Sequence, residues 1–306
     1  MTEAPPVTEA AEADPAPARR GARLVLDLLV FPLVMVAVGV GIFVLFGLIT
    51  AEGKGPADYL DLIRTGDSNR RWQAAYELSR VIQAGRDPGL ADPRLVGQMV
   101  SLFERAEDDD PRVRRFLALA LGRLGDAHAV PVLLAYLKSA EEGEAPDPET
   151  RIYAVWALGA IGDETAVPEL LSLMTHEDPG LRKTAAHALG VFRTEEAEAA
   201  LGRALGDPVG DVRWNAALAL ARHADPAAVP VLVEMMDREQ LARDEAVTPA
   251  QTEEILLQAI QGAVRLGDAR LASRLVELGN SDPSLRVRAA ARRGLEGRGA
   301  SGSAAP

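Results

Sequence analysis

The chain has 306 residues, 48% of them hydrophobic, which supplies a sizeable core and excludes disorder of the whole chain. Its 45 acidic residues outnumber its 33 Lys and Arg residues, and the net charge of −12 argues against nucleic acid as a partner, because such a field repels phosphates. The chain has no cysteine, which excludes disulfides, thiol catalysis and iron–sulfur clusters, and its aromatic content of 4% favours stacked helices over a β-sandwich.

The N-terminal part predicts a tail followed by a membrane-spanning helix. Residues 1–22 are predicted to be disordered, since Ala, Pro and Glu dominate them and leave little to bury. No charged residue occurs from Leu28 to Ile49, and a helix of that length, at about 1.5 Å per residue, crosses the roughly 30 Å core of a bilayer. We predict a transmembrane helix over residues 23–50, which contacts the membrane through residues 28–49, and a linker over residues 51–56. A cleaved signal peptide is the alternative, but its apolar region is shorter, about 7 to 15 residues.

The flanking charges predict the orientation of this helix. Arg19, Arg20 and Arg23 precede it, whereas only Lys54 and Arg64 follow it closely. Because positive residues stay on the cytoplasmic side, we expect a cytoplasmic N-terminus and the remaining domain on the opposite side of the membrane.

Residues 57–297 repeat one pattern. The stretch DPRVRRFLALALGRLGD (residues 110–126) recurs as DPETRIYAVWALGAIGD (residues 147–163), each copy continues into Ala-Val-Pro, and further copies begin at Asp178 and Asp207. In the first copy Val113, Leu117 and Leu121 share one helical face, and a second apolar helix follows. Two such helices cannot bury both apolar faces alone, so the units must stack. The sequence therefore predicts an all-α solenoid of about six to seven helical hairpins, preceded by the transmembrane helix and followed by a disordered tail over residues 298–306.

These repeats resemble the HEAT repeat, in particular the short variety named after phycobilisome lyases. The matching pattern is Asp-Pro-x-Val-Arg, then Ala-x-x-Ala-Leu-Gly-x-Leu-Gly-Asp, then Ala-Val-Pro-x-Leu, and it extends over roughly residues 66–297. The resemblance implies the fold and not the function. A short-repeat HEAT protein with one anchor further implies a bacterial inner membrane.

One arginine recurs near the start of each first helix. We interpret it as a structural ladder in which each guanidinium pairs with the Asp or the backbone of a neighbouring turn and ties unit to unit. The alternative is a ladder that binds a ligand. The ladder comprises Arg71, Arg114, Arg151, Arg182 and Arg213, together with the turn residues Asp126 and Asp163.

The second helices carry a candidate protein-binding stripe. Solenoids bind partners on a curved face, which we expect the second helices to form. Their aligned apolar positions are Val132, Tyr136, Leu173, Val231 and Met235. If exposed, this stripe would be the apolar centre of a protein-binding groove; the alternative is that it packs between adjacent repeats.

The arginines of the last repeat have two interpretations. They cap the stack with a polar face, or they contact anionic lipid or an acidic partner. The cluster comprises Arg286, Arg288, Arg292, Arg293 and Arg298.

The motifs favour a non-catalytic protein. No phosphate-binding loop, nucleophile elbow, HExxH or EF-hand pattern occurs. A di-iron enzyme of this fold, deoxyhypusine hydroxylase, is recognised by several His-Glu pairs, and this chain has only His176-Glu177, so no metal and no cofactor are expected. We expect a membrane-anchored scaffold or adaptor with an unidentified protein partner. The alternatives are a lyase-like or cofactor- or protein-maturation enzyme, and a structural subunit of a membrane complex.

Overall fold

The computed structural model describes residues 32–42, 54–139, 147–243 and 247–302. The chain divides into two units, Met1–Lys54 and Gly55–Pro306. In the first unit, residues 32–42 form a helix on which every side chain is exposed, for example Leu33 at 70% and Val36 at 64%. Among the residues that the structure describes, no helix combines the length and apolar composition that crossing a bilayer requires. The remainder of the predicted transmembrane segment, the predicted tail over residues 1–22 and residues 51–53 of the predicted linker lie outside the described residues.

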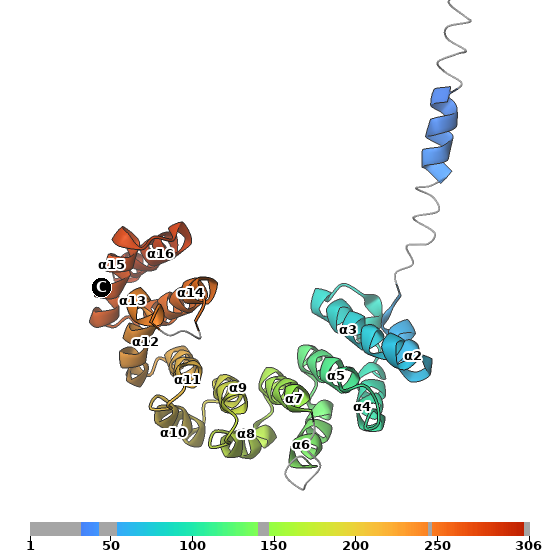
Figure 1. Cartoon of the computed structure of the whole chain (residues 1–306), viewed down its shortest axis with the longest axis horizontal. Coiled ribbons are helices and arrows are strands. Elements are labelled where there is room, and N and C mark those ends of the chain that lie inside the picture. Colours follow the sequence, from blue (N-terminus) through green and yellow to red (C-terminus); the bar gives the residue numbers. More distant parts are fainter. Residues whose placement is uncertain (1–31, 43–53, 140–146, 244–246, 303–306) are drawn as a thin grey trace, which may run out of the picture. The chain divides into compact units, whose positions relative to one another are not determined.

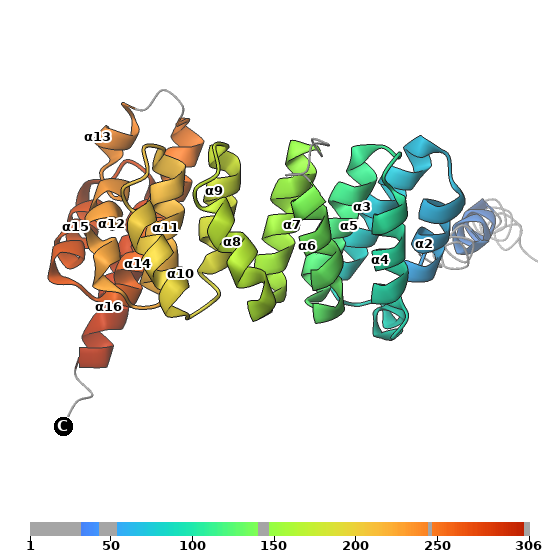
Figure 2. The ribbon, with the colours of Figure 1, turned by 90° about the horizontal axis from the view of Figure 1, so that it is seen from below.

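The second unit is a two-layered stack of helices, as the repeats predict. One layer holds the first helix of each repeat: α3 (Ser68–Ala84), α5 (Pro111–Leu124), α7 (Pro148–Ile161), α9 (Pro179–Leu189), α11 (Gly210–Arg222), α14 (Pro249–Leu266) and α16 (Leu285–Gly302). The other layer holds α2 (Pro56–Thr65), α4 (Leu95–Arg105), α6 (Val130–Ser139), α8 (Val167–Leu173), α10 (Glu195–Ala204), α12 (Val229–Met235) and α15 (Ala269–Ser281). Short helices connect them: η1 (Pro88–Ala91), η2 (Ala127–Ala129), η3 (Glu164–Ala166), η4 (Pro226–Ala228) and α13 (Arg238–Leu241). Figure 2 shows the helices side by side in chain order. The all-α solenoid is confirmed.

Helix α5 shows how the repeated residues start and stop a helix. Asp110 precedes it and accepts a hydrogen bond from the backbone amide of Arg112 (3.0 Å), while Pro111 takes the first helical position, where no amide is needed. Gly125 ends the helix with a φ of 69°, a left-handed conformation that glycine adopts without steric cost. The equivalent residue after α11 is Ala224, and its φ is 62°.

The first helices lie on the inside of the curve of this unit (Figure 1). Glycine residues at their contacts allow these helices to lie close to one another. A Cβ atom on Gly122 would lie 2.7 Å from Ala157 Cα, and one on Gly159 would lie 2.7 Å from Ala188 Cα. Neighbouring first helices therefore approach to backbone contact, whereas the second helices bury larger side chains such as Leu133. The layer with the smaller contact residues follows the shorter arc. Our prediction that the second helices form the curved binding face was wrong for this reason.

The predicted binding stripe lies in the core. Its side chains are nearly inaccessible: Val132 is 9% exposed, Tyr136 7%, Leu173 1%, Val231 7% and Met235 0%. The Tyr136 ring meets the ring of Phe103, from the neighbouring second helix α4, edge to face at 5.4 Å between centroids. The stripe packs between adjacent repeats and cannot present an apolar groove to a partner, which corrects that hypothesis.

The ends of the domain differ slightly from the predicted boundaries. Helix α2 begins at Pro56, and α16 continues through Gly297 and Gly299 to Gly302. Glycine lowers the stability of a helix by about 1 kcal/mol per residue but does not by itself end one. The predicted tail over residues 298–306 is therefore corrected for residues 298–302.

Candidate functional site

The repeated arginines bind the chain segment that ends the preceding second helix. Arg114 donates from Nε to the carbonyl of Phe103 (3.0 Å) and from Nη2 to that of Glu104 (3.1 Å). Arg182 donates in the same way to the carbonyl of His176 (2.8 Å). These bonds satisfy carbonyls that a helix end leaves without a partner.

Carboxylates of neighbouring turns complete this network. Arg182 donates from Nε and Nη2 to the two carboxylate oxygens of Asp207 (2.8 and 3.0 Å), which opens the next repeat. This hydrogen bonding lowers the pKa of Asp207 below its ordinary value. Arg71 pairs with Asp109. Arg71 and Arg182 thus join consecutive repeats, and these contacts leave them unavailable as members of a ligand ladder.

Two other arginines of the ladder differ in their contacts. Arg213 donates to the Asp207 carbonyl (2.9 Å) and pairs with Glu234 (2.6 Å). The Nε of Arg151 is buried and has no hydrogen-bond partner among the residues that the structure describes.

Asp126 and Asp163 do not belong to the ladder. Asp126 accepts the backbone amide of His128 (2.9 Å) and Asp163 that of Thr165 (2.9 Å), so each caps the short helix that follows it. Both turns follow the C-terminal end of a first helix, whereas the arginines lie near its N-terminal end, about 15 Å away at 1.5 Å per residue. This corrects their predicted role as arginine partners.

Two of the histidines, His176 and His223, have structural contacts. His176 Nδ1 accepts the backbone amide of Asp178 (2.9 Å) in the inter-repeat turn. The buried His223 donates from Nε2 to the carbonyl of Gly190 (3.0 Å), since a carbonyl can only accept. In the described part of the chain, no three His, Asp or Glu side chains gather as metal ligands do.

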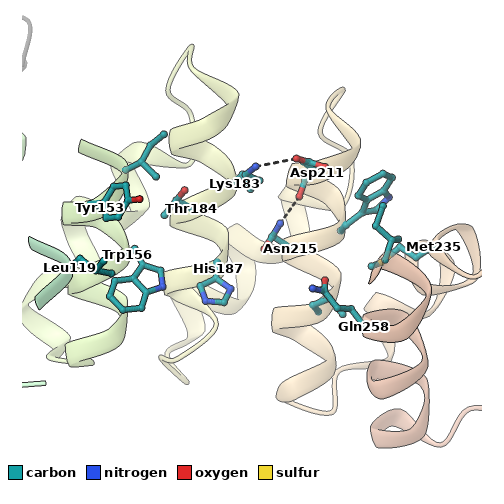
Figure 3. Close-up of a pocket in the computed structure, with 14 residues that line it drawn as sticks. Leu119, Tyr153, Trp156, Lys183, Thr184, His187, Asp211, Asn215, Met235 and Gln258 are labelled. Carbon is teal, nitrogen blue, oxygen red and sulfur yellow. Dashed lines mark hydrogen bonds and ion pairs between the residues drawn. The ribbon is translucent and has the colours of Figure 1, made fainter. Parts of the chain in front are cut away.

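The concave face carries a different candidate site, a hollow of about 520 Å³ between α5 and α14 (Figure 3). Tyr153 and Trp156 of α7 line one side of it, Trp214 and Leu218 of α11 line the other, and Ile255 of α14 closes the far end. Trp156 lies over Gly122, where a Cβ atom would be 2.8 Å from the indole ring. The hollow is therefore walled mainly by aromatic and aliphatic side chains.

Polar groups lie between these walls. Lys183 of α9 pairs with Asp211 of α11 (3.1 Å), and Asn215 donates to the Asp211 carbonyl (2.8 Å), as Figure 3 shows. The imidazole of His187 makes no hydrogen bond to any described residue. Partial burial, and then the nearby Arg222, lower its pKa below the ordinary value of about 6.5, so the ring is neutral at pH 7 although part of the residue stays open to solvent.

The hollow arises from positions that do not repeat. One residue after each ladder arginine the chain has Trp72, Arg115, Ile152, Lys183 and Trp214. Five residues after it the chain has Tyr76, Leu119, Trp156, His187 and Leu218. All three tryptophans of the chain occupy these two rows. The sequence comparison missed this face because it looked for residues that recur in every repeat. The residues of the hollow lie at positions that differ from one repeat to the next.

The aromatic residues at the N-terminal end of this face are already in contact with one another. Tyr76 meets Phe116 edge to face at 5.1 Å between centroids, and Arg112 stacks over Trp72 at 4.1 Å. Tyr76 is still 40% exposed, and Tyr153 and Trp156, further along the face, are half-buried.

The chain matches known repeat families over part of its length. Residues 142–201 and 188–251 match HEAT repeats, and residues 113–139 match the PBS lyase HEAT-like repeat. Residues 113–139 and 142–251 of the chain therefore contain HEAT repeats. No curated protein matches its sequence. Among solved structures, it is similar to the complex of CpcE and CpcF of phycocyanin lyase from Nostoc sp. PCC7120, with a TM-score of 0.54 and 22% identity over 80% of this chain and 89% of that one. Human deoxyhypusine hydroxylase in complex with glycerol gives a TM-score of 0.34 and 19% identity over 79% of this chain and 94% of that one. At such identities the first likeness concerns the fold alone.

Proposed function

We propose that this HEAT-repeat protein is a membrane-anchored scaffold that binds a partner protein on its concave face and does not turn over a substrate. The observation that carries the proposal is the aromatic hollow around the half-buried Tyr153 and Trp156. Trp and Tyr are enriched among the residues that contribute most to protein interfaces. HEAT repeats generally bind proteins, and solenoids use their extended concave surface for this purpose.

The polar groups of the hollow support binding rather than catalysis. Lys183 is paired with Asp211, and Thr184 donates to the carbonyl of Gly180 (2.8 Å). Among the described residues around the hollow, no hydroxyl group donates a hydrogen bond to a carboxylate or an imidazole, as an activated hydroxyl nucleophile would. The alternative of a lyase-like or maturation enzyme rests on likeness of fold, which does not carry an activity.

The membrane anchor is part of this proposal. The helix of residues 32–42 exposes only apolar side chains, Pro and Gly on all its faces, and water is an unfavourable environment for such a surface. It lies within the uncharged segment of residues 28–49, which has the length of a bilayer crossing. We place the N-terminus in the cytoplasm and the repeats across a bacterial inner membrane, on the distribution of Arg and Lys. The anchor raises the local concentration of the repeats at the membrane surface, so that weak binding suffices.

A pull-down with matched charge variants tests the function. The tagged full-length chain is extracted in mild detergent, and its partners are identified by mass spectrometry. Trp156→Glu places a charge in the hollow and should abolish capture, whereas Val276→Glu, on the exposed side of α15, should retain it. Circular dichroism must show equal helicity for both variants. Undiminished capture by Trp156→Glu would refute the site, and a partner lost only on deletion of residues 1–51 would favour a structural subunit of a membrane complex.

A further inference from the structure

Two guanidinium groups without a carboxylate partner adjoin the aromatic hollow. A second hollow, of about 310 Å³, shares His187 and Gln258 with the first and is lined by Arg222 of α11 and Arg265 of α14. Neither arginine forms an ion pair with any residue that the structure describes. Arg71, Arg182 and Arg213 of the ladder each have a carboxylate partner, and these two guanidiniums differ from them in that respect.

The position of Arg222 is fixed by its packing. Its Nη2 donates to the carbonyl of His187 (3.2 Å), and a Cβ atom on Gly190 would lie only 2.1 Å from that nitrogen. The guanidinium therefore fills the space that the glycine leaves. Both guanidiniums line the second hollow, and burial, and then the positive charge of Arg265, lower the pKa of Arg222.

The cationic surface continues towards the C-terminus. A third hollow, of about 1000 Å³, lies between α14 and α16, shares Arg265 with the second, and adds Arg286 and Arg293. Arg286 pairs with Glu253 (2.7 Å), while Arg293 donates to the backbone carbonyl of Ala289 (3.3 Å) and forms no ion pair with any described residue. The carboxylate in this lining is Glu254, which accepts a hydrogen bond from Gln258. The concave face thus has an aromatic half at α7 to α11 and a cationic half at α11 to α16, in a chain of net charge −12.

We propose that the segment bound on the concave face is acidic, with a bulky apolar side chain against Tyr153 and Trp156 and a neighbouring Asp or Glu carboxylate at Arg222 and Arg265. This inference rests on the proposed function and names the chemistry of its partner. Guanidinium groups bind carboxylates through two parallel charge-assisted hydrogen bonds, and a carboxylate here would also relieve the repulsion between the two cations. A peptide segment fits better than an anionic bilayer, because Arg222 lies on the inner layer of a curved surface that a flat membrane cannot follow.

A peptide selection tests this inference without knowledge of the natural partner. The full-length chain in zwitterionic lipid nanodiscs is used to select binders from a random-peptide phage library, and the selected peptides are synthesised beside copies in which Asp and Glu become Asn and Gln. We expect selected peptides to combine a large apolar residue with Asp or Glu, and the amide copies to bind at least about tenfold more weakly. Affinity should fall as salt concentration rises.

Variants of the cationic residues complete the test. Arg265→Gln should weaken the acidic peptides about tenfold and leave their amide copies unchanged. Arg265→Glu should lower the affinity for the acidic peptides further. The matched control is Arg203→Gln, an exposed arginine on α10 in the other layer, which should leave binding unchanged. Because Arg265 is exposed, these changes test the contact without removing a packed side chain.

The outcomes separate the two proposals. In one outcome, peptides bind whether or not they contain acidic residues, and they lose binding with Trp156→Glu but not with Arg265→Gln. That result would overturn the proposal of an acidic segment and leave the proposed scaffold function intact. Failure to recover any peptide would contradict both. If no acidic peptide is selected, and if the chain binds anionic vesicles in a way that Arg265→Gln abolishes, the arginines are a lipid-binding site instead.

Discussion

Ala224 follows α11 in a conformation that glycine adopts at the equivalent turns, and replacing it should stabilise the protein. Its φ is 62°, the Ala224 amide donates to the Ala221 carbonyl (3.1 Å), and the Asp225 amide donates to the Leu220 carbonyl (3.0 Å). This is the bonding pattern of a helix closed by a left-handed residue. A side chain in that region costs about 1–2 kcal/mol, and Ala224→Gly removes the cost. The greater freedom of glycine in the unfolded chain offsets about 0.5–1 kcal/mol, so the net gain should be about 0.5–1 kcal/mol.

Urea unfolding of the full chain, followed by circular dichroism in a fixed detergent, measures this gain. Because solenoids open repeat by repeat, hydrogen exchange at the end of α11 should be followed in parallel, and its protection should rise. The matched control is Gly125→Ala, which adds a side chain at a φ of 69° and should destabilise by about 1 kcal/mol. A loss of stability with Ala224→Gly, or no effect of Gly125→Ala, would refute the steric reasoning.

Two further substitutions test the packing and the ladder. Gly159→Ala should lower the free energy of unfolding by about 1–3 kcal/mol, because its Cβ would lie 2.7 Å from Ala188 Cα. The same change at Gly97, an exposed position of α4 with open space around it, should raise that free energy by about 0.5–1 kcal/mol. Equal unfolding midpoints of the two variants would contradict the close approach of the first helices. Asp207→Asn should cost about 1–3 kcal/mol at pH 7, because Arg182 loses its charged partner. Because the pKa of Asp207 is lowered in the folded state, its contribution to stability is complete above the ordinary carboxyl pKa of about 4 and is lost as the pH falls below it. The free energies of unfolding of the unaltered chain and of Asp207→Asn should therefore converge in acid. A difference that stays constant to low pH would count against the Arg182–Asp207 ion pair.

The fold was predictable because one set of residues performs the same local task in every repeat. Asp110 with Pro111 starts α5 and Gly125 ends it, and the apolar spacing between them marks the buried face. These are local effects, visible within about twenty residues of sequence. The single-pass anchor rests on equally local evidence, the uncharged stretch of residues 28–49, and stays a prediction.

The site was not predictable from the same features. Which layer lies inside the curve depends on how closely neighbouring helices approach, and that distance is set by contacts such as Gly122 against Ala157, from different repeats. The stripe around Tyr136 looked like a surface because its pattern repeats, yet repetition is also what inter-repeat packing requires. The hollow combines side chains from α5 to α14. Arg222 and Arg265 line one hollow because α11 and α14 are adjacent in the fold.

Site-specific photo-crosslinking in cells tests the central claim most directly, namely that a partner protein occupies the concave face. A benzophenone amino acid replaces Tyr153 in the hollow in one variant and Val276 on the exposed side of α15 in the other. The account predicts a discrete adduct with a protein from position 153 and none from position 276. Equal adducts from both positions, or an adduct from position 276 alone, would contradict it.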